Sequence, residues 1–168
     1  MEMVDIVDEN LQILYQISKQ EAHEKGLLHK CVIAELTNSK GQIMLIRPYS
    51  HKQDAGRFVS PVGGHVSAGE SDVDALKREV LEEIGIGHFT HKFIGKAIFD
   101  RHVLGRHENH YFLLYEIVSD DIPELGDEAE TGEWFTREEL KMAIKKNKRD
   151  FGDAFFKVVN SFYKDLLE

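Results

Sequence analysis

The sequence has one cysteine, Cys31, and no long run of apolar residues. A single cysteine excludes an intramolecular disulfide framework and fits a reducing compartment. We interpret Cys31 as a small apolar core residue. No apolar stretch approaches the roughly 20 residues of a membrane-spanning helix, and the N-terminal segment MEMVDIVDEN lacks the apolar region of a signal peptide. We therefore expect a cytoplasmic protein with no membrane partner.

Basic residues are also fewer than acidic residues. The chain has 21 Lys and Arg and 30 Asp and Glu, which gives a formal net charge of −9. Proteins that follow a nucleic-acid backbone usually carry a basic face, so we expect no nucleic-acid polymer as partner. An acidic protein can still bind a small phosphorylated molecule if a metal ion supplies positive charge. With 168 residues, of which 42% are hydrophobic, the chain is long enough for one domain with its own core.

Helix signals occur at four places in the chain. Residues 1–27 predict a hairpin followed by a short helix between Ser18 and Gly26. Further helices are expected from near Ser71, from Thr136 to about residue 146, and over about 150–167.

Apolar patterns between these helices predict strands. The expected strands cover residues 28–36, 42–47, 89–99, 111–118 and 134–135, with a short extended piece at 58–62. We interpret the charged segments 100–110 and 120–133 as connections rather than strands. The pattern indicates a single mixed α+β domain.

The stretch from Gly64 to Ile86 is a glycine turn followed by an acidic helix. Glu79, Glu82 and Glu83 are spaced i, i+3 and i+4, so a helix brings their carboxylates to one face. Three ionised carboxylates repel each other, and a divalent cation that prefers hard oxygen ligands offsets this repulsion. The helix therefore predicts a platform for Mg²⁺, with Mn²⁺ as the alternative.

The same stretch resembles the Nudix box at every fixed position. The matching residues are Gly64, Glu70, Arg78, Glu79, Val80, Glu82, Glu83, Gly85 and Ile86. At ordinary residue frequencies such a match arises by chance on the order of once in 10⁸ start positions. The resemblance implies an α/β/α sandwich with a mixed sheet over residues 1–168. It also implies hydrolysis of a nucleoside diphosphate linked to another group, X.

The resemblance also implies a role for each residue of the box. Gly64, Glu79, Glu82 and Glu83 are expected to hold the metal, which neutralises the diphosphate and activates the attacking water. Glu79 and Glu83 are the expected catalytic carboxylates, with Glu79 favoured as general base. Arg78 is expected to orient a glutamate of the box through its planar guanidinium.

Other polar residues carry weaker expectations. Glu70 stands at the helix entrance, where we expect it to cap the helix rather than to act in catalysis. Arg47 and Arg57 flank the loop before the box and could bind terminal phosphate oxygens, or simply be solvated. The substrate stays open between a nucleoside diphosphate, a dinucleotide, a nucleotide sugar and a non-nucleotide diphosphate.

Over about residues 4–140 the chain also resembles the isopentenyl diphosphate isomerase branch of this superfamily. The segments that carry this likeness are EAHEKGLLHK, NSKGQIMLIR, FVSPVGGHVSAGES and ENH. That isomerase needs a cysteine two residues before His65, where this chain has Gly63, and an acid where it has His110. Without this proton donor and acceptor, isomerase chemistry is disfavoured and a hydrolase member is expected.

The isomerase resemblance implies a second metal site at His23, His29, His65 and Glu108. Three histidines and a carboxylate suit zinc or manganese. The missing carboxylate at position 110 weighs against this site, and a lone histidine is more often a hydrogen-bonded surface or core residue.

Three functions follow from the sequence, in descending order. The first is a Mg²⁺-dependent pyrophosphohydrolase, the second a non-catalytic sensor of nucleotides or diphosphates, and the third an isopentenyl diphosphate isomerase. The oligomeric state is open, because the aromatic-rich tail after residue 150 could pack internally or form a homodimer face.

Overall fold

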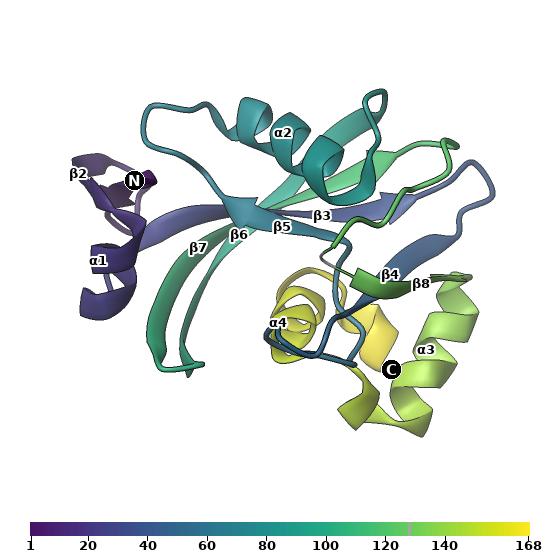
Figure 1. Cartoon of the computed structure of the whole chain (residues 1–168). Coiled ribbons are helices and arrows are strands. Elements are labelled where there is room, and N and C mark those ends of the chain that lie inside the picture. Colours follow the sequence, from purple (N-terminus) through teal and green to yellow (C-terminus); the bar gives the residue numbers. More distant parts are fainter. Residues whose placement is uncertain (128) are drawn as a thin grey trace.

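The computed structural model describes residues 1–127 and 129–168. These residues form one α+β domain around a strongly curved sheet, with α2 on one side and α3 and α4 on the other (Figure 1). The strands are β1 Met3–Val7, β2 Ile13–Ser18, β3 His29–Thr37, β4 Ile43–Pro48, β5 Val62–His65, β6 Thr90–Val103, β7 Arg106–Val118 and β8 Ala129–Phe135. The helices are α1 Lys19–Lys25, α2 Asp72–Ile84, α3 Arg137–Lys146 and α4 Asp153–Phe162, with 3₁₀ turns at Lys148–Asp150 and Lys164–Leu167.

Strand β3 is the centre of the sheet. It pairs in parallel with β7 along its whole length and antiparallel with β4, β5 and β1. Its ladder with β1 is a single residue pair, Ile6 with His29. The N-terminal hairpin and α1 therefore attach to one margin of the sheet, as Figure 1 shows at the purple end of the chain.

Alternation along β3 divides the core into two layers. Val32, Ala34 and Leu36 point to the layer under α2. Cys31 and Ile33 point to the opposite layer, where α4 covers the sheet. Because side chains alternate with a period of two, one strand can serve both layers.

Helix α2 forms as the sequence predicts. The Ser71 hydroxyl accepts a hydrogen bond from the Asp74 amide at 3.1 Å, and the helix ends at Gly85, whose φ of 67° is left-handed. Leu76, Val80 and Ile84 are fully buried against the sheet. This apolar face fixes the helix, so its acidic face is free to line a site.

The structure differs from the sequence prediction in three segments. Residues 100–110 are strand rather than connection, because β6 and β7 run on to a tight turn at Leu104 and Gly105. Strand β8 starts at Ala129 instead of residue 134, and the C-terminal helix is shorter than predicted, at 153–162. In the first two segments polar side chains obscure the apolar alternation that usually identifies a strand. Within the described residues, the helices are too short or too polar to cross a bilayer.

Candidate active site and histidine cluster

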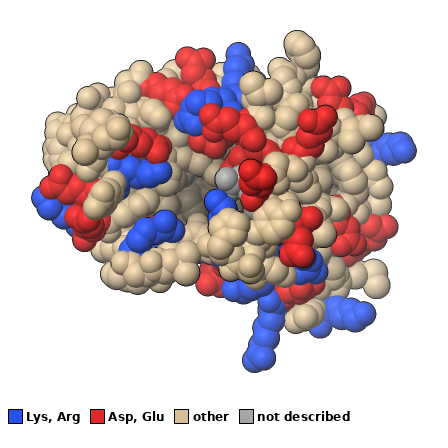
Figure 2. Space-filling model, in the orientation of Figure 1, with Lys and Arg blue, Asp and Glu red and all other residues tan. Residues whose placement is uncertain are grey.

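A cavity of about 310 Å³ lies between the box and the curved ends of β6 and β7. Figure 2 shows a hollow in this region, with Lys and Arg near its rim and Asp and Glu above it. Box residues Gly63, Gly64 and Glu83 form part of its wall. Its other lining residues include the cations Lys19, Lys52, Arg101 and Arg106, the acids Asp54 and Glu108, and apolar side chains such as Ile33, Phe112 and Phe155.

Two box carboxylates lie against the glycine segment of β5. The Gly63 amide donates to Glu83 Oε2 at 2.8 Å. A Cβ atom on Gly64 would lie 2.1 Å from Glu79 Cδ, so only glycine lets this carboxylate come so near the backbone. Hard oxygens thus gather around the glycine segment of β5, which fits a Mg²⁺ or Mn²⁺ ion. Glu82 is exposed beside them, its Oε2 3.5 Å from Arg78 Nη1.

Arg78 organises the carboxylates of the box. It donates through Nε and Nη2 to Glu70, each at 2.9 Å, and through Nη1 to Glu79 Oε1 at 2.6 Å. A further bond from Nη2 reaches the His65 carbonyl at 3.0 Å. The expected contact between Arg78 and a box glutamate is therefore confirmed.

The carboxylates held by Arg78 differ in their environment. Arg78 holds the pKa of the partly exposed Glu70 below its usual value. Burial raises the pKa of Glu79, while Arg78 opposes the shift. The expectation that Glu70 caps the helix is wrong, because Ser71 is the N-cap and Glu70 instead accepts from the Ser67 amide at 3.0 Å and from Arg78.

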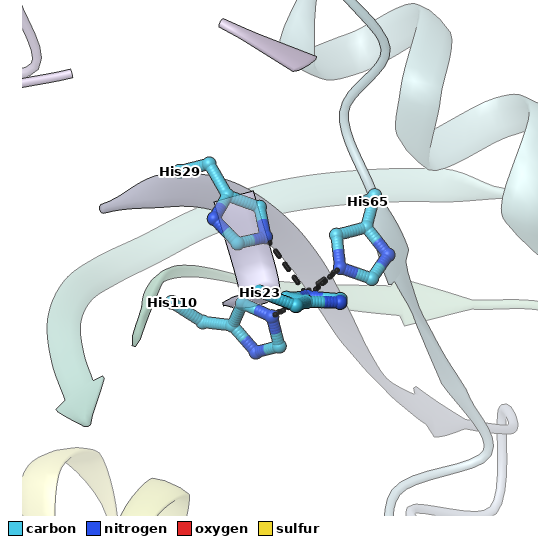
Figure 3. A group of neighbouring side chains, drawn as sticks. All are labelled: His23, His29, His65 and His110. Carbon is cyan, nitrogen blue, oxygen red and sulfur yellow. Dashed lines mark hydrogen bonds between the residues drawn. The ribbon is translucent and has the colours of Figure 1, made fainter. Parts of the chain in front are cut away.

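Four histidines converge on one another, as Figure 3 shows, and three of them, His23, His65 and His110, line the same cavity. His23 comes from α1, His29 from β3, His65 from β5 and His110 from β7. His23 Nε2 lies 3.2 Å from the Nε2 atoms of His29, His65 and His110. The Nε2 atoms of His65 and His110 are 3.3 Å apart. All four ligand atoms lie within 4.8 Å of one another.

These imidazoles occupy an environment that favours their neutral form. Burial lowers the pKa of His29 to about 4 and holds the pKa values of His23, His65 and His110 below the usual value. His29 is fully buried, and its Nδ1 lies 2.7 Å from the Leu27 carbonyl oxygen. That contact assigns the proton to Nδ1 and leaves the Nε2 lone pair directed at the other rings.

The fourth member of the cluster is His110 and not Glu108 as expected. Glu108 lies two residues earlier on β7 and pairs with Arg106, at 2.6 Å, and with Arg101, at 3.4 Å. Its Oε1 is buried without a hydrogen bond in the structure. Position 110 holds a histidine instead of an acid, which weighed against a second metal site in the sequence. In the structure, this histidine is the fourth imidazole of the cluster. Reading residues 100–110 as a strand would have placed Glu108 and His110 on one face.

The structure gives Arg47 and Arg57 other partners. Arg47 makes a two-point ion pair with Asp150, at 2.7 and 2.9 Å, and lies over the Phe58 ring. Arg57 lies within 3.6 Å of carboxylate oxygens of Asp54 and Asp153. Neither arginine is among the described residues that line the cavity. Their role in substrate binding stays a prediction without support from these contacts.

Three of the cavity cations, Lys19, Arg101 and Arg106, were not predicted from the sequence. Arg101 and Arg106 lie in the segment interpreted as a connection, and Lys19 opens α1. The spacing of Arg106, Glu108 and His110, two residues apart, could have identified this segment as a strand with one polar face.

Gly63 and Cys31 line the same cavity. Gly63 has open space where a side chain would be. Cys31 is on β3, directly opposite His65 in the β3–β5 ladder, and burial raises the pKa of its thiol. It is a buried free cysteine, as the sequence reading expected.

Comparisons with known proteins agree with this geometry. The model of the NUDIX domain matches residues 27–155. An uncharacterized Nudix hydrolase of Streptomyces coelicolor is 35% identical over 106 residues, which are 59% of this chain and 56% of that protein. An isopentenyl-diphosphate Delta-isomerase of Pectobacterium atrosepticum is 28% identical over 155 residues, 88% of this chain and 84% of that protein. A crystal structure from Deinococcus radiodurans has a TM-score of 0.75 at 24% identity, covering 96% of this chain and 99% of that one, a likeness in fold.

Proposed function

Because the chain belongs to the Nudix family, we propose that it is a Mg²⁺-dependent pyrophosphohydrolase. Its substrate would be a nucleoside diphosphate linked to X, or a related organic diphosphate. The observation that carries this proposal is that Glu79 and Glu83 lie against Gly64 and Gly63, and that Gly63, Gly64 and Glu83 line a cavity that also has four cationic side chains in its wall. The volume of about 310 Å³ suits a small molecule rather than a polymer.

Nudix enzymes generally use divalent metals. Here the carboxylates of Glu79, Glu82 and Glu83 and the Gly64 carbonyl would hold the ion, which supplies charge neutralisation of the diphosphate and activation of water. Arg78 keeps the Glu79 carboxylate in place while Glu79 accepts the proton of the attacking water.

The cationic side chains have a separate task. Lys19, Arg101 and Arg106 line the cavity and would attract the phosphate groups of the substrate. Glu108 is buried between the two arginines, at 3.4 and 2.6 Å, and holds them at the wall. The apolar lining at Ile33 and Phe112 would receive the part of the substrate that carries no charge.

A phosphate-release screen with Mg²⁺ and Mn²⁺ over nucleotide and non-nucleotide diphosphates tests this function. The products are identified by mass, which gives both the substrate and the bond that is cleaved. We expect release of phosphate or of a phosphorylated fragment from at least one class. Binding of a ligand without cleavage across the whole panel would favour the non-catalytic sensor instead.

The third function, isopentenyl diphosphate isomerase, has one observation in its favour, the similarity to proteins of that name over most of the chain. Gly63 and His110 stand where that chemistry needs a thiol and a carboxylate. Incubation with isopentenyl diphosphate in heavy water is therefore expected to give no proton exchange, and exchange detected by mass would overturn our choice. The expected cytoplasmic location and a homodimer stay predictions.

A further inference from the structure

The distances within the histidine cluster match the edges of a metal-coordination tetrahedron. For zinc–nitrogen bonds of about 2.0–2.1 Å, a regular tetrahedron has nitrogen–nitrogen edges of about 3.3–3.4 Å. Four of the six Nε2 pairs are separated by 3.2 or 3.3 Å, and the other two lie within 4.8 Å. A neutral imidazole has one N–H, so a proton on His23 Nε2 could serve only one of its three Nε2 neighbours at a time, whereas a metal ion at the centre would accept all four lone pairs.

We propose that His23, His29, His65 and His110 bind one transition-metal ion of the zinc type, which clamps α1 to the sheet. All four ligands come from the protein, as in closed structural zinc sites. The site is separate from the box, because its ligands are imidazole nitrogens of His23, His29, His65 and His110 and not the carboxylates of α2. This inference does not depend on the proposed hydrolysis.

The ligand chemistry selects the kind of ion. Imidazole suits zinc, copper, nickel and iron, whereas magnesium prefers carboxylate, carbonyl and water oxygens. The Leu27 carbonyl fixes the tautomer of His29 through Nδ1, which is the usual outer contact of a metal-ligating histidine. A magnesium ion held by the box and a zinc ion held by the cluster would therefore not compete.

The N-terminal unit has a small core, to which an ion would add a further link with the sheet. Its hairpin joins β3 through a single registered pair and residues 67–68 through a bridge from Val4 and a backbone hydrogen bond to Met3, and its buried apolar cluster contains Val4, Ile6 and Ala22. His23 is the ligand carried by α1, while the other three belong to strands of the sheet. An ion shared by the two parts links them directly.

Metal content tests the site. The full chain, purified without a histidine tag, is loaded with Zn²⁺, desalted and measured by elemental mass spectrometry. We expect one tightly held zinc per chain in the wild type, a loss of at least about tenfold in zinc retained by His23→Gln and His65→Gln, and no loss in the exposed control His88→Gln. Equal zinc in His23→Gln and wild type would overturn the proposal.

The box variant Glu83→Gln separates this site from the proposed active site. It should keep its zinc even if it loses hydrolysis. Loss of zinc in Glu83→Gln but not in His65→Gln would mean that the box, and not the cluster, holds the ion. This measurement gives an answer whether or not a substrate is found.

Two further readouts address geometry and the clamp. Co²⁺ in the site should give the intense visible bands of tetrahedral coordination, and the weak bands of six-coordinate cobalt would contradict a closed four-histidine site. On chelation of the wild type, hydrogen exchange should speed up in α1 and stay unchanged in α3. In His23→Gln, α1 should exchange fast with or without zinc, while unaltered α1 exchange on chelation would exclude the clamp.

Discussion

The box and the histidine cluster border one cavity, yet they offer opposite ligand chemistry. At the box the expected ligands are carboxylates that range from the buried Glu79 to the exposed Glu82, and hydrogen bonds from Arg78 and the Gly63 amide hold Glu79 and Glu83. At the cluster they are imidazoles, three buried and His65 partly buried, whose Nε2 atoms contact each other. The difference teaches that one cavity can present two ligand sets with different metal preferences, hard oxygens at one side and imidazole nitrogens at the other.

The largest effect is expected from Glu83→Gln. Removing one carboxylate charge weakens magnesium binding and the activation of water, so kcat should fall by about 10³-fold. The exposed α3 substitution Glu138→Gln is the matched control and should keep wild-type turnover. Steady-state kinetics at saturating Mg²⁺ measure both, and near-wild-type kcat in Glu83→Gln would remove the box from the mechanism.

Gly64→Ala tests the close approach of backbone and carboxylate. Its Cβ would collide with Glu79 Cδ at 2.1 Å, so the carboxylate must move and kcat should fall by roughly 10²-fold. Gly87→Ala is the control, because its Cβ meets nothing within 4 Å. The zinc content of both variants should equal that of the wild type. If Gly64→Ala also loses zinc, the two regions are coupled and the comparison fails.

Arg78→Lys should have a smaller effect on turnover. A lysine cannot hold Glu70 by two bonds and reach Glu79 at the same time, so Glu79 loses its fixed position. We expect kcat to fall by about tenfold with KM changed little, because Arg78 positions a box residue and does not line the cavity. A rise in KM at constant kcat would instead indicate that Arg78 binds substrate.

Glu35→Gln should leave turnover unchanged and alter only stability. Burial raises the pKa of Glu35 to about 7, from 4.5. Between these values the folded chain keeps a proton that the unfolded chain has lost, so stability falls as pH rises from about 5 to 7, by on the order of 1–3 kcal/mol.

Denaturation at a series of pH values measures this decline, which Glu35→Gln should remove. The variant then serves as a background in which any remaining pH dependence can be compared between metal-loaded and chelated protein. An unchanged slope in Glu35→Gln would show that another group causes it.

The two regions also differ in how far the sequence revealed them. The box is contiguous, so the sequence predicts that Arg78 contacts a glutamate of the box, and the structure shows that this glutamate is Glu79. The cluster depends on strand pairing, since His29 and His110 are neighbours only because β3 and β7 align in parallel. This pairing was not predicted, because residues 100–110 carry charged side chains toward a polar cavity and so lack the apolar alternation that identifies a strand. The fold class itself followed from local patterns, as the caps of α2 and α3 illustrate.

The first and last histidines of the cluster are 87 residues apart in the chain. On a ribosome the protein therefore emerges with three ligands long before the fourth, and β7 must pair with β3 before the set is complete. An ion at this site would be acquired late, by a chain whose sheet has already assembled. Which metal is bound would then depend on the metals available to the folded protein, and not on those available during synthesis.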